Sequence, residues 1–294
     1  MKYALMARCR AEFPLTMMCR VLGVSRAGFY DWLGREPSAQ ARRREAVGDV
    51  LEEVFHRHKR RYGAPRLRRA LNDKGVGCSQ NYVAKLMRAR CLQAHNGKGF
   101  RYTKSIEATT QVKENVLDRN FASDGPNRKW VSDITYIRVG RGWAYLAVVL
   151  DLHSRTVVGW ALDTHMRESL ILEALRMARG RRLVQPGLLL HSDRGVQYRA
   201  KEYQQALEDL GIQASMSRKG NCWDNAVMEA FFARLKVELI YPENYRDFDA
   251  LRAGLFEYIE IYYNRQRLHS SLGYNNPAKY ELESHRLNVS TICG

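Results

Sequence analysis

The chain has 294 residues, 45% of them hydrophobic and 10% aromatic, which is enough to bury one large core or about two to three smaller ones. This composition excludes a disordered protein, and no apolar run is long enough to span a bilayer. The net charge is +17, and residues 1–105 hold 23 Lys+Arg against 8 Asp+Glu. Because nearly all the excess lies in this first third, it predicts a surface that binds a polyanion such as nucleic acid, and not merely a basic, well-solvated protein.

The start of the chain and the cysteines point to an intracellular protein. Basic residues interrupt MKYALMARCRAEF, which therefore lacks the apolar stretch of a signal peptide. Six cysteines are scattered without a CxxC or CxxH pair, so we expect free thiols and no zinc site. We expect a cytoplasmic protein without membrane contacts.

The first third reads as two helix-turn-helix-like regions. In residues 1–60, a short amphipathic helix at 15–22 is followed by a break at Gly23 and a helix from Arg26 that Ser25 can cap. In residues 61–105, a helix beginning near Pro65 ends at Gly75, and Ser79 can cap a second helix from Gln80 to about Arg90. A simple helical hairpin has the same pattern. The exposed residues that we expect to contact DNA from these regions are Arg26, Tyr30, Arg66, Arg68, Lys85 and Arg88.

A polar linker at 106–125 precedes a predicted α/β domain at 126–245 and a C-terminal helix with a polar tail at 246–294. Three strands joined by short turns form an antiparallel meander, and helix and strand then alternate. The order predicts a mixed sheet flanked by helices. The predicted strands are 130–139, 143–152, 156–161, 188–191 and 212–217, and the predicted helices are 167–179, 200–210, 223–238 and 248–263.

Three acidic residues stand out in this domain. Asp133 lies in the middle of a strand, where Asp is disfavoured, and Asp193 follows the carboxyl end of a buried strand, where ligands bind in open α/β sheets. Glu229 lies on a helix that can cross beside the sheet; taken alone it would be an ordinary surface residue. Three converging carboxylates would repel one another unless cations neutralised them, and oxygen ligands suit Mg²⁺ or Mn²⁺. Two such ions about 4 Å apart support in-line phosphoryl transfer.

Several neighbours of these acids have two interpretations. On helix 223–238, Asn225, Glu229 and Lys236 share the face opposite the apolar one, and Asp224 or Asn225 can cap the helix. Asn225 then either caps or lies near the metals. His191 either packs at its strand end or supports the metal ligands or DNA. Arg218 and Lys219 precede the helix in a loop, where they are expected to guide phosphate unless the loop is merely solvated. For Trp223, core packing is favoured over a DNA contact.

Three stretches carry a resemblance to a known superfamily: WVSDITYI around Asp133, HSDRGVQY around Asp193 and NCWDNAVMEAFFARLKVE around Glu229. They resemble the DDE transposases and retroviral integrases, which have a ribonuclease-H-like core. More narrowly, the chain is similar to the catalytic second-frame protein of frameshifting bacterial insertion sequences. The 35 residues between Asp193 and Glu229 match that family, as do YGAPRLRRAL (62–71) and YNRQRLHSSLGYNNPAKY (263–280). The resemblance covers nearly the whole chain.

The resemblance implies cleavage of DNA strands at the ends of a mobile element and transfer of the freed 3′-hydroxyl to another strand. Asp133, Asp193 and Glu229 would be the catalytic ligands of two Mg²⁺ or Mn²⁺ ions, and Lys236 would contact DNA. The implied partners are the terminal inverted repeats, target DNA, further copies of the chain and the upstream-frame protein, at the nucleoid of a bacterium.

Two other functions remain open. A DNA-binding regulator of the element would need no catalysis, but it would gain nothing from three acids beside a polyanion. A nuclease would cut without joining, but the helix-turn-helix signals disfavour an unspecific one.

Overall fold

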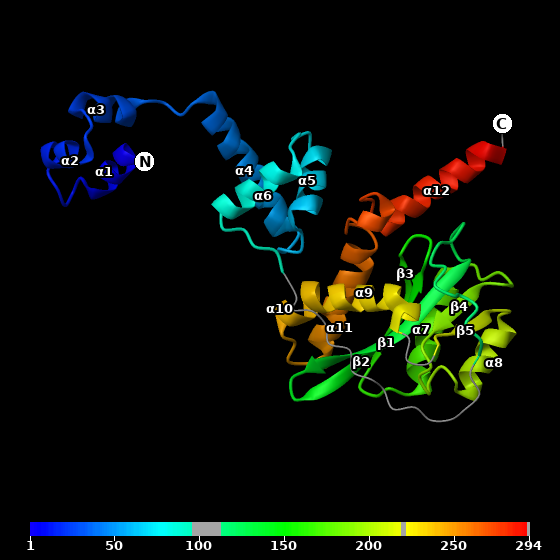
Figure 1. Cartoon of the computed structure of the whole chain (residues 1–294). Coiled ribbons are helices and arrows are strands. Elements are labelled where there is room, and N and C mark those ends of the chain that lie inside the picture. Colours follow the sequence, from blue (N-terminus) through cyan, green and yellow to red (C-terminus); the bar gives the residue numbers. More distant parts are fainter. Residues whose placement is uncertain (96–112, 219–221, 293–294) are drawn as a thin grey trace.

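The computed structural model of the chain describes residues 1–95, 113–218 and 222–292 (Figure 1). Two groups of helices come first, and an α/β domain with a helical C-terminal part follows. Within the described ranges, no helix is both long and apolar enough to cross a membrane.

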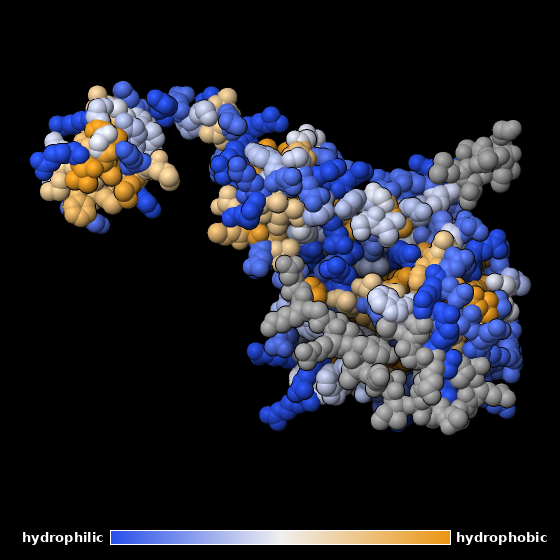
Figure 2. All heavy atoms as spheres, in the orientation of Figure 1, coloured by the Kyte–Doolittle hydropathy of each residue, from blue (hydrophilic) through white to orange (hydrophobic). Residues whose placement is uncertain are grey.

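The first three helices form a small unit that Figure 1 shows apart from the rest of the chain. They are α1 (Lys2–Cys9), α2 (Leu15–Leu22) and α3 (Arg26–Gly34), packed around Met6, Met18 and Phe29. Gly23 ends α2 with φ 61°, a left-handed conformation that favours glycine, and the Ser25 hydroxyl accepts a hydrogen bond from the Gly28 N–H at the start of α3. This is the predicted helix, turn and capped helix. Orange apolar side chains remain visible on this unit in Figure 2.

A second helical unit follows: α4 (Ala39–Arg57), α5 (Ala64–Asp73) and α6 (Gln80–Ala89). Pro65 lies in the first turn of α5, and the Ser79 hydroxyl caps α6 by accepting from the Tyr82 N–H, as the sequence predicts. Buried side chains on all three helices hold the unit together, and it joins the large hydrophobic core of the α/β domain; they include Leu51, Phe55, Leu67, Leu71 and Val83.

The α/β domain is built on a five-stranded mixed sheet of order β3-β2-β1-β4-β5. The first three strands pair antiparallel, and β4 and β5 add in parallel on the other side of β1, which confirms the predicted ribonuclease-H-like arrangement. The strands are β1 (Lys129–Val139), β2 (Gly142–Asp151), β3 (Val157–Asp163), β4 (Leu189–Ser192) and β5 (Gln213–Met216).

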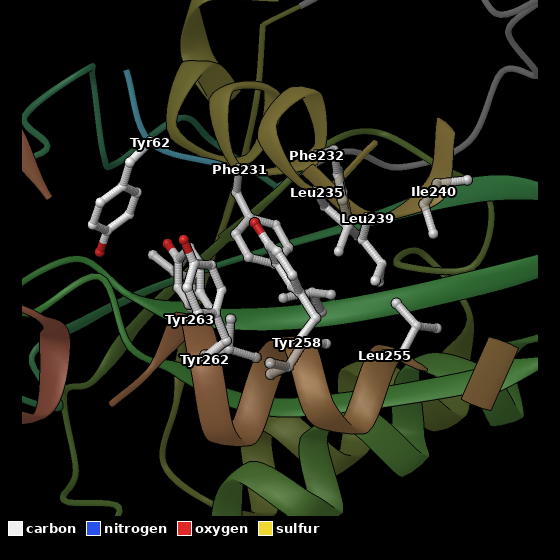
Figure 3. Close-up of a cluster of buried hydrophobic side chains, with 14 of the residues drawn as sticks. Tyr62, Phe231, Phe232, Leu235, Leu239, Ile240, Leu255, Tyr258, Tyr262 and Tyr263 are labelled. Carbon is white, nitrogen blue, oxygen red and sulfur yellow. The ribbon is translucent and has the colours of Figure 1, made fainter. Parts of the chain in front are cut away.

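Helices α7 (Glu168–Arg181) and α8 (Lys201–Asp209) cover one face of the sheet, and their buried side chains share a core with Trp130 and Val149. Gly159 on β3 permits the close approach of α7, because a Cβ at this position would lie 2.1 Å from the Ala174 carbonyl oxygen. The core of the opposite face is formed with α9 (Ala226–Leu235) and the helices that follow it (Figure 3).

The predicted helix 223–238 consists of three pieces. A 3₁₀ turn, Cys222–Asn225, leads into α9, and the turns after it widen into a π-helix, Lys236–Ile240. Its buried apolar side is Met228, Phe231, Phe232 and Leu235, whereas Ala230 is exposed. The face opposite is not a solvated one, because Asn225 and Lys236 are both buried.

The C-terminal region contains more helix than the sequence predicts. After α10 (Tyr241–Glu243), α11 (Phe248–Phe256) continues as a π-helix, Glu257–Tyr263, in place of one regular helix. The stretch expected as a polar tail holds a 3₁₀ turn, Ser270–Leu272, and a further helix, α12 (Pro277–Ile292). The spacing of apolar residues that marks an amphipathic helix is weak in α12, so the sequence predicts a tail at this place.

Glu238, in the π-helix after α9, is the centre of a buried charge cluster, the Glu238 cluster. Arg267 donates to both carboxylate oxygens, at 2.8 and 2.7 Å, and the Tyr258 hydroxyl donates to one of them at 2.9 Å. The side chains of Glu238 and Arg267 are each 3% exposed. Burial opposes ionisation of Glu238, but its hydrogen bonds and ion pair with Arg267 hold its pKa below the usual value.

The same cluster attaches the second helical unit to the α/β domain. Arg66 of α5 lies 3.6 Å from the Glu238 carboxylate and donates to the Leu268 carbonyl. Arg61 donates to the Glu238 carbonyl, and its guanidinium lies 4.4 Å from the Tyr262 ring centroid. The Tyr62 hydroxyl bonds to the backbone on either side of Arg267. The conspicuous motifs 62–71 and 263–280 therefore meet each other.

Removing one partner of this buried pair should destabilise the whole chain. We expect Arg267→Ala to lower the free energy of unfolding by about 3–5 kcal/mol, because it leaves the Glu238 carboxylate buried without its main counter-charge. Urea denaturation measures the change. The exposed neighbour Arg265 is the matched control, and Arg265→Ala should shift stability by no more than about 0.5 kcal/mol. Equal effects of the two substitutions would contradict the assignment.

Candidate active site

Asp133 lies halfway along β1, opposite Val148 of β2. Its carboxylate is only partly buried, and Oδ1 accepts a hydrogen bond from the Ile134 N–H at 2.8 Å. In the described residues, β4 pairs with Lys129–Val131 and leaves the edge of β1 beyond Val131 without a strand partner. Asp133 therefore stands where the sheet opens, which accounts for an acid in the middle of a strand.

Asp193 directly follows β4, the strand parallel to β1, so both acids belong to the same end of the sheet. Oδ1 of Asp193 accepts from the Gly195 N–H at 2.9 Å. A Cβ on Gly195 would lie 3.0 Å from that oxygen, so a larger residue there would press on the carboxylate.

Glu229 lies on α9, which packs beside β1. Burial raises its pKa above the usual value. Burial also raises the pKa of Asp133, well above its usual value, and the negative charges of Asp193 and Glu229 raise it further. The structure thus brings the three predicted acids within electrostatic range of one another from a strand, a strand end and a helix.

The three carboxylates do not form a complete metal site in the described part of the chain. Among the residues that the structure describes, no group of three or more His, Cys, Asp or Glu side chains is arranged to hold a metal ion. The donors themselves are of the right kind: Asp133, Asp193 and Glu229 are partly buried residues whose carboxyl groups have raised pKa values, and a hard divalent cation would favour their ionised form.

Lys236 lies inside this site and not on an open DNA-facing surface. It is 7% exposed, and its ammonium lies 4.9 Å from the ring centroid of Tyr136 on β1. Burial lowers the pKa of Lys236, while the charge of Asp133 acts in the opposite direction. Lys236 therefore contributes positive charge next to Asp133.

Asp224 anchors the start of the helix that carries Glu229. It is fully buried, and it accepts hydrogen bonds from the Arg218 guanidinium and backbone N–H, from Arg119 at 2.9 Å and from Asn115 at 2.9 Å. Hydrogen bonds from Arg218 hold its pKa well below the usual range, although burial opposes them. The sequence predicts phosphate guidance for Arg218, but its guanidinium is engaged with Asp224 and Asp118. Lys219 lies outside the described residues.

Three other neighbours take definite positions. His191 is fully buried in β4, with its ring nitrogens hydrogen-bonded to Ser215 at 2.9 Å and Ser217 at 3.1 Å, so it packs within the sheet. Asn225 is the N-cap residue of α9, but among the described residues it makes no capping bond and neither amide atom has a hydrogen-bond partner. Trp223, which the sequence assigns to the core, is 68% exposed instead.

The predicted DNA contacts on the helical units divide into two groups. Arg66 faces inward and belongs to the Glu238 cluster, which explains its burial without any DNA. The others lie on the surface, where nucleic acid can reach them: Arg26, Tyr30, Arg68, Lys85 and Arg88.

Comparison with known proteins agrees with this geometry. The integrase core domain model matches residues 123–222, a second integrase core domain model matches 210–277, and an HTH-like domain model matches 42–98. These matches define a protein with an integrase core and an HTH-like domain.

The chain is 41% identical over 283 residues to "Transposase InsF for insertion sequence IS3A" of Escherichia coli (strain K12), covering 96% of this chain and 98% of that one. It is 39% identical over 248 residues to "Transposase for insertion sequence element IS904" of Lactococcus lactis subsp. lactis (strain IL1403), covering 84% and 98%. The chain belongs to the IS3 family of insertion-sequence transposases, as its motifs predict.

Solved structures show a more distant likeness. The simian T-cell lymphotropic virus intasome, solved with PP2A regulatory subunit B56 gamma, contains a chain 18% identical, with TM-score 0.47, covering 73% of this chain and 70% of that one. The HTLV-2 integrase catalytic core domain in complex with magnesium is 17% identical, with TM-score 0.41, covering 53% and 97%.

Removing the charge of Asp133 should stabilise the metal-free protein. The pKa of Asp133 is raised in the folded protein, so the wild type loses stability as pH rises through that pKa. Asp133→Asn has no ionisable group at this position and does not lose this stability. We expect Asp133→Asn to be more stable than wild type in EDTA at neutral pH, and equal to it in acid. Thermal unfolding across pH measures both, with the exposed Asp209→Asn as a control that should show neither effect. A less stable Asp133→Asn at neutral pH would contradict the conclusion that burial and the two other acids disfavour the charged form of Asp133.

Proposed function

We propose that this transposase cuts DNA strands at the ends of its element and transfers the freed 3′-hydroxyl to another DNA strand, with Asp133, Asp193 and Glu229 as catalytic metal ligands. The observation that carries the proposal is the placement of Asp133 on β1, Asp193 at the end of the adjacent parallel strand and Glu229 on the helix packed against β1; burial and the charges of the two other acids raise the pKa of Asp133. A cluster that destabilises its own charge is typical of a functional site and unfavourable for a purely structural one.

The ligand chemistry favours Mg²⁺ or Mn²⁺, and we propose two ions. When bound, such a pair would hold the attacking and leaving oxygens of the phosphodiester in line and stabilise their negative charge. The backbone bonds to Asp133 and Asp193 fix the position of one carboxylate oxygen on each residue. Lys236 offsets part of the negative charge around Asp133.

Binding of the element ends would come from the helical units. The exposed basic residues of α3 and α6, with Arg68 of α5, are the candidates for contacts with phosphates and base edges. The predicted division into 1–60, 61–105, 106–125, 126–245 and 246–294 remains a proposal; the packing of α4 on α5 and α6 favours a first boundary before α4.

We propose that the working assembly contains DNA ends, target DNA and more than one copy of the chain, with the upstream-frame protein of the same element as a further partner, at the bacterial nucleoid. The alternatives are a regulator without catalysis and a nuclease that does not join. The electrostatic strain among the acids disfavours the regulator.

Asp193→Asn tests the catalytic role. With Mg²⁺ and DNA carrying the terminal repeats, we expect strand transfer to fall by at least about 100-fold, since even changes to residues behind metal ligands cost about 10–100-fold. Binding to the ends should stay within about twofold of wild type. The control Asp209→Asn, an exposed acid on α8, should transfer strands normally. Unchanged transfer by Asp193→Asn would refute the proposed metal role, and cleavage without joining by the wild type would establish the nuclease.

Lys85→Ala tests the DNA surface of α6. Loss of one phosphate contact should weaken binding to all sequences alike and reduce the slope of log K against log salt by about one. Fluorescence anisotropy at several salt concentrations measures that slope. Arg179→Ala removes an exposed charge from α7, on the α/β domain, and should leave the slope unchanged. Identical slopes for wild type and Lys85→Ala would mean that α6 does not contact the backbone.

A further inference from the structure

Two exposed aromatic rings lie on the β1–β2 hairpin just beyond the catalytic acids. Tyr136 is 49% exposed and Trp143 46%, and their ring centroids are 5.3 Å apart with the planes at 79°. A cation lies over each ring: Lys236 at 4.9 Å from the Tyr136 centroid and Arg138 at 5.6 Å from that of Trp143. We call these four residues the hairpin ledge.

The register of the hairpin explains how the ledge forms. Tyr136 pairs with Tyr145 and Arg138 with Trp143, so Tyr136 and Trp143 are diagonal neighbours on one face of the two strands. On the other face Ile137 and Ala144 are buried in the core. The hairpin thus already has a buried face, and its stability does not require a second pair of large apolar side chains in solvent.

The ledge adjoins the candidate active site. Tyr136 is three residues after Asp133 on the same strand, so the two side chains point to opposite faces of the sheet, and Lys236 links them: it interacts electrostatically with Asp133 while its ammonium lies over Tyr136. One side chain, Lys236, therefore connects the acids to the aromatic pair.

The charge of the hairpin is uniformly positive. Residues 134–150 contain no Asp or Glu, whereas Arg138 and Arg141 are exposed on it. A cross-strand aromatic pair alone would account for the ring contact, at about 0.2–1 kcal/mol. It would not account for the exposed Arg138 and Arg141 in a segment without acids, and this positive charge beside exposed rings matches the phosphates and flat bases of a DNA strand.

We propose that the hairpin ledge binds the DNA strand next to the phosphodiester that is cut, with an unpaired base stacked against Trp143 and Tyr136 and phosphates beside the exposed Arg138 and Arg141. This inference rests on the proposed function, because it takes Asp133 to mark the place of the chemistry. A single unpaired nucleotide is the occupant, since only an unstacked base offers its face to a protein ring.

The test uses the full-length chain in EDTA, so that no DNA is cut. The probes are an element end with a short single-stranded extension and the same end fully paired, both fluorescently labelled. We expect Trp143→Ala to weaken binding of the extended probe by about 5- to 150-fold, the range for losing one stacked base, and of the paired probe by less than about twofold. Trp143→Phe, which keeps a ring, should stay within about threefold of wild type on both. Phe256→Ala removes an exposed ring from α11 and should change neither.

Photocross-linking gives a second measurement that does not depend on affinity. A 5-iodouracil in the unpaired extension should cross-link to the peptide that carries Trp143 or Tyr136. Equal affinities of wild type and Trp143→Ala for the extended probe would overturn the proposal, as would cross-links confined to other segments. If Asp193→Asn abolishes transfer while Trp143→Ala binds normally, the ledge is wrong and the catalytic proposal holds. If Asp193→Asn still transfers strands while Trp143→Ala loses the extended probe, the catalytic proposal is wrong and the ledge holds.

Discussion

The buried ion pair between Glu238 and Arg267 is the interaction on which the arrangement of the domains depends. Two charges in a dry core are costly unless each is fully bonded, and here the bonds come from segments far apart in the chain. Three segments meet at this pair: Arg66 comes from the second helical unit, Glu238 follows the helix that carries Glu229, and Arg267 lies near the C-terminus. Any packing that separated them would leave a buried charge unpaired.

The position of the helix that carries Glu229 follows from this constraint. At its start, Asp224 is held by Arg218, Arg119 and Asn115, and at its far end Glu238 is held by the cluster. Glu229 lies between these two anchors. In a regular α-helix, residues two positions apart point in nearly opposite directions; here the π-helix after α9 buries both Lys236, near Asp133, and Glu238. The height and rotation of Glu229 are thus fixed by charges at both ends of its helix as well as by the apolar side that packs on the sheet.

Much of this structure is predictable from the sequence because the relevant signals are local. Alternation and turn residues identify the strands, an acid in the middle of a strand marks Asp133, and a buried strand followed by Asp193 marks the end of the sheet. The family motifs then predict the integrase core, which the relatives and the sheet order confirm.

The partners of charged residues are not predictable in the same way. A run of basic residues predicts a polyanion nearby, but it does not tell which side chains turn inward. Arg66 and Arg218 look like DNA contacts until Glu238 and Asp224 are found beside them in space. Lys236, expected at a DNA-facing surface, is buried, and Trp223, expected in the core, is exposed. Both differences arise because contacts made over long sequence distances anchor the helix that carries these residues. Only a three-dimensional structure reveals these contacts.

We propose that Asp133, Asp193 and Glu229 converge on divalent metal. Anomalous diffraction from crystals of the chain with Mn²⁺ and an element-end DNA would locate that metal. We expect manganese peaks bounded by these three carboxylates and by the phosphodiester to be cut. Peaks located elsewhere, or three carboxylates that stay apart with Mn²⁺ and DNA both bound, would contradict it.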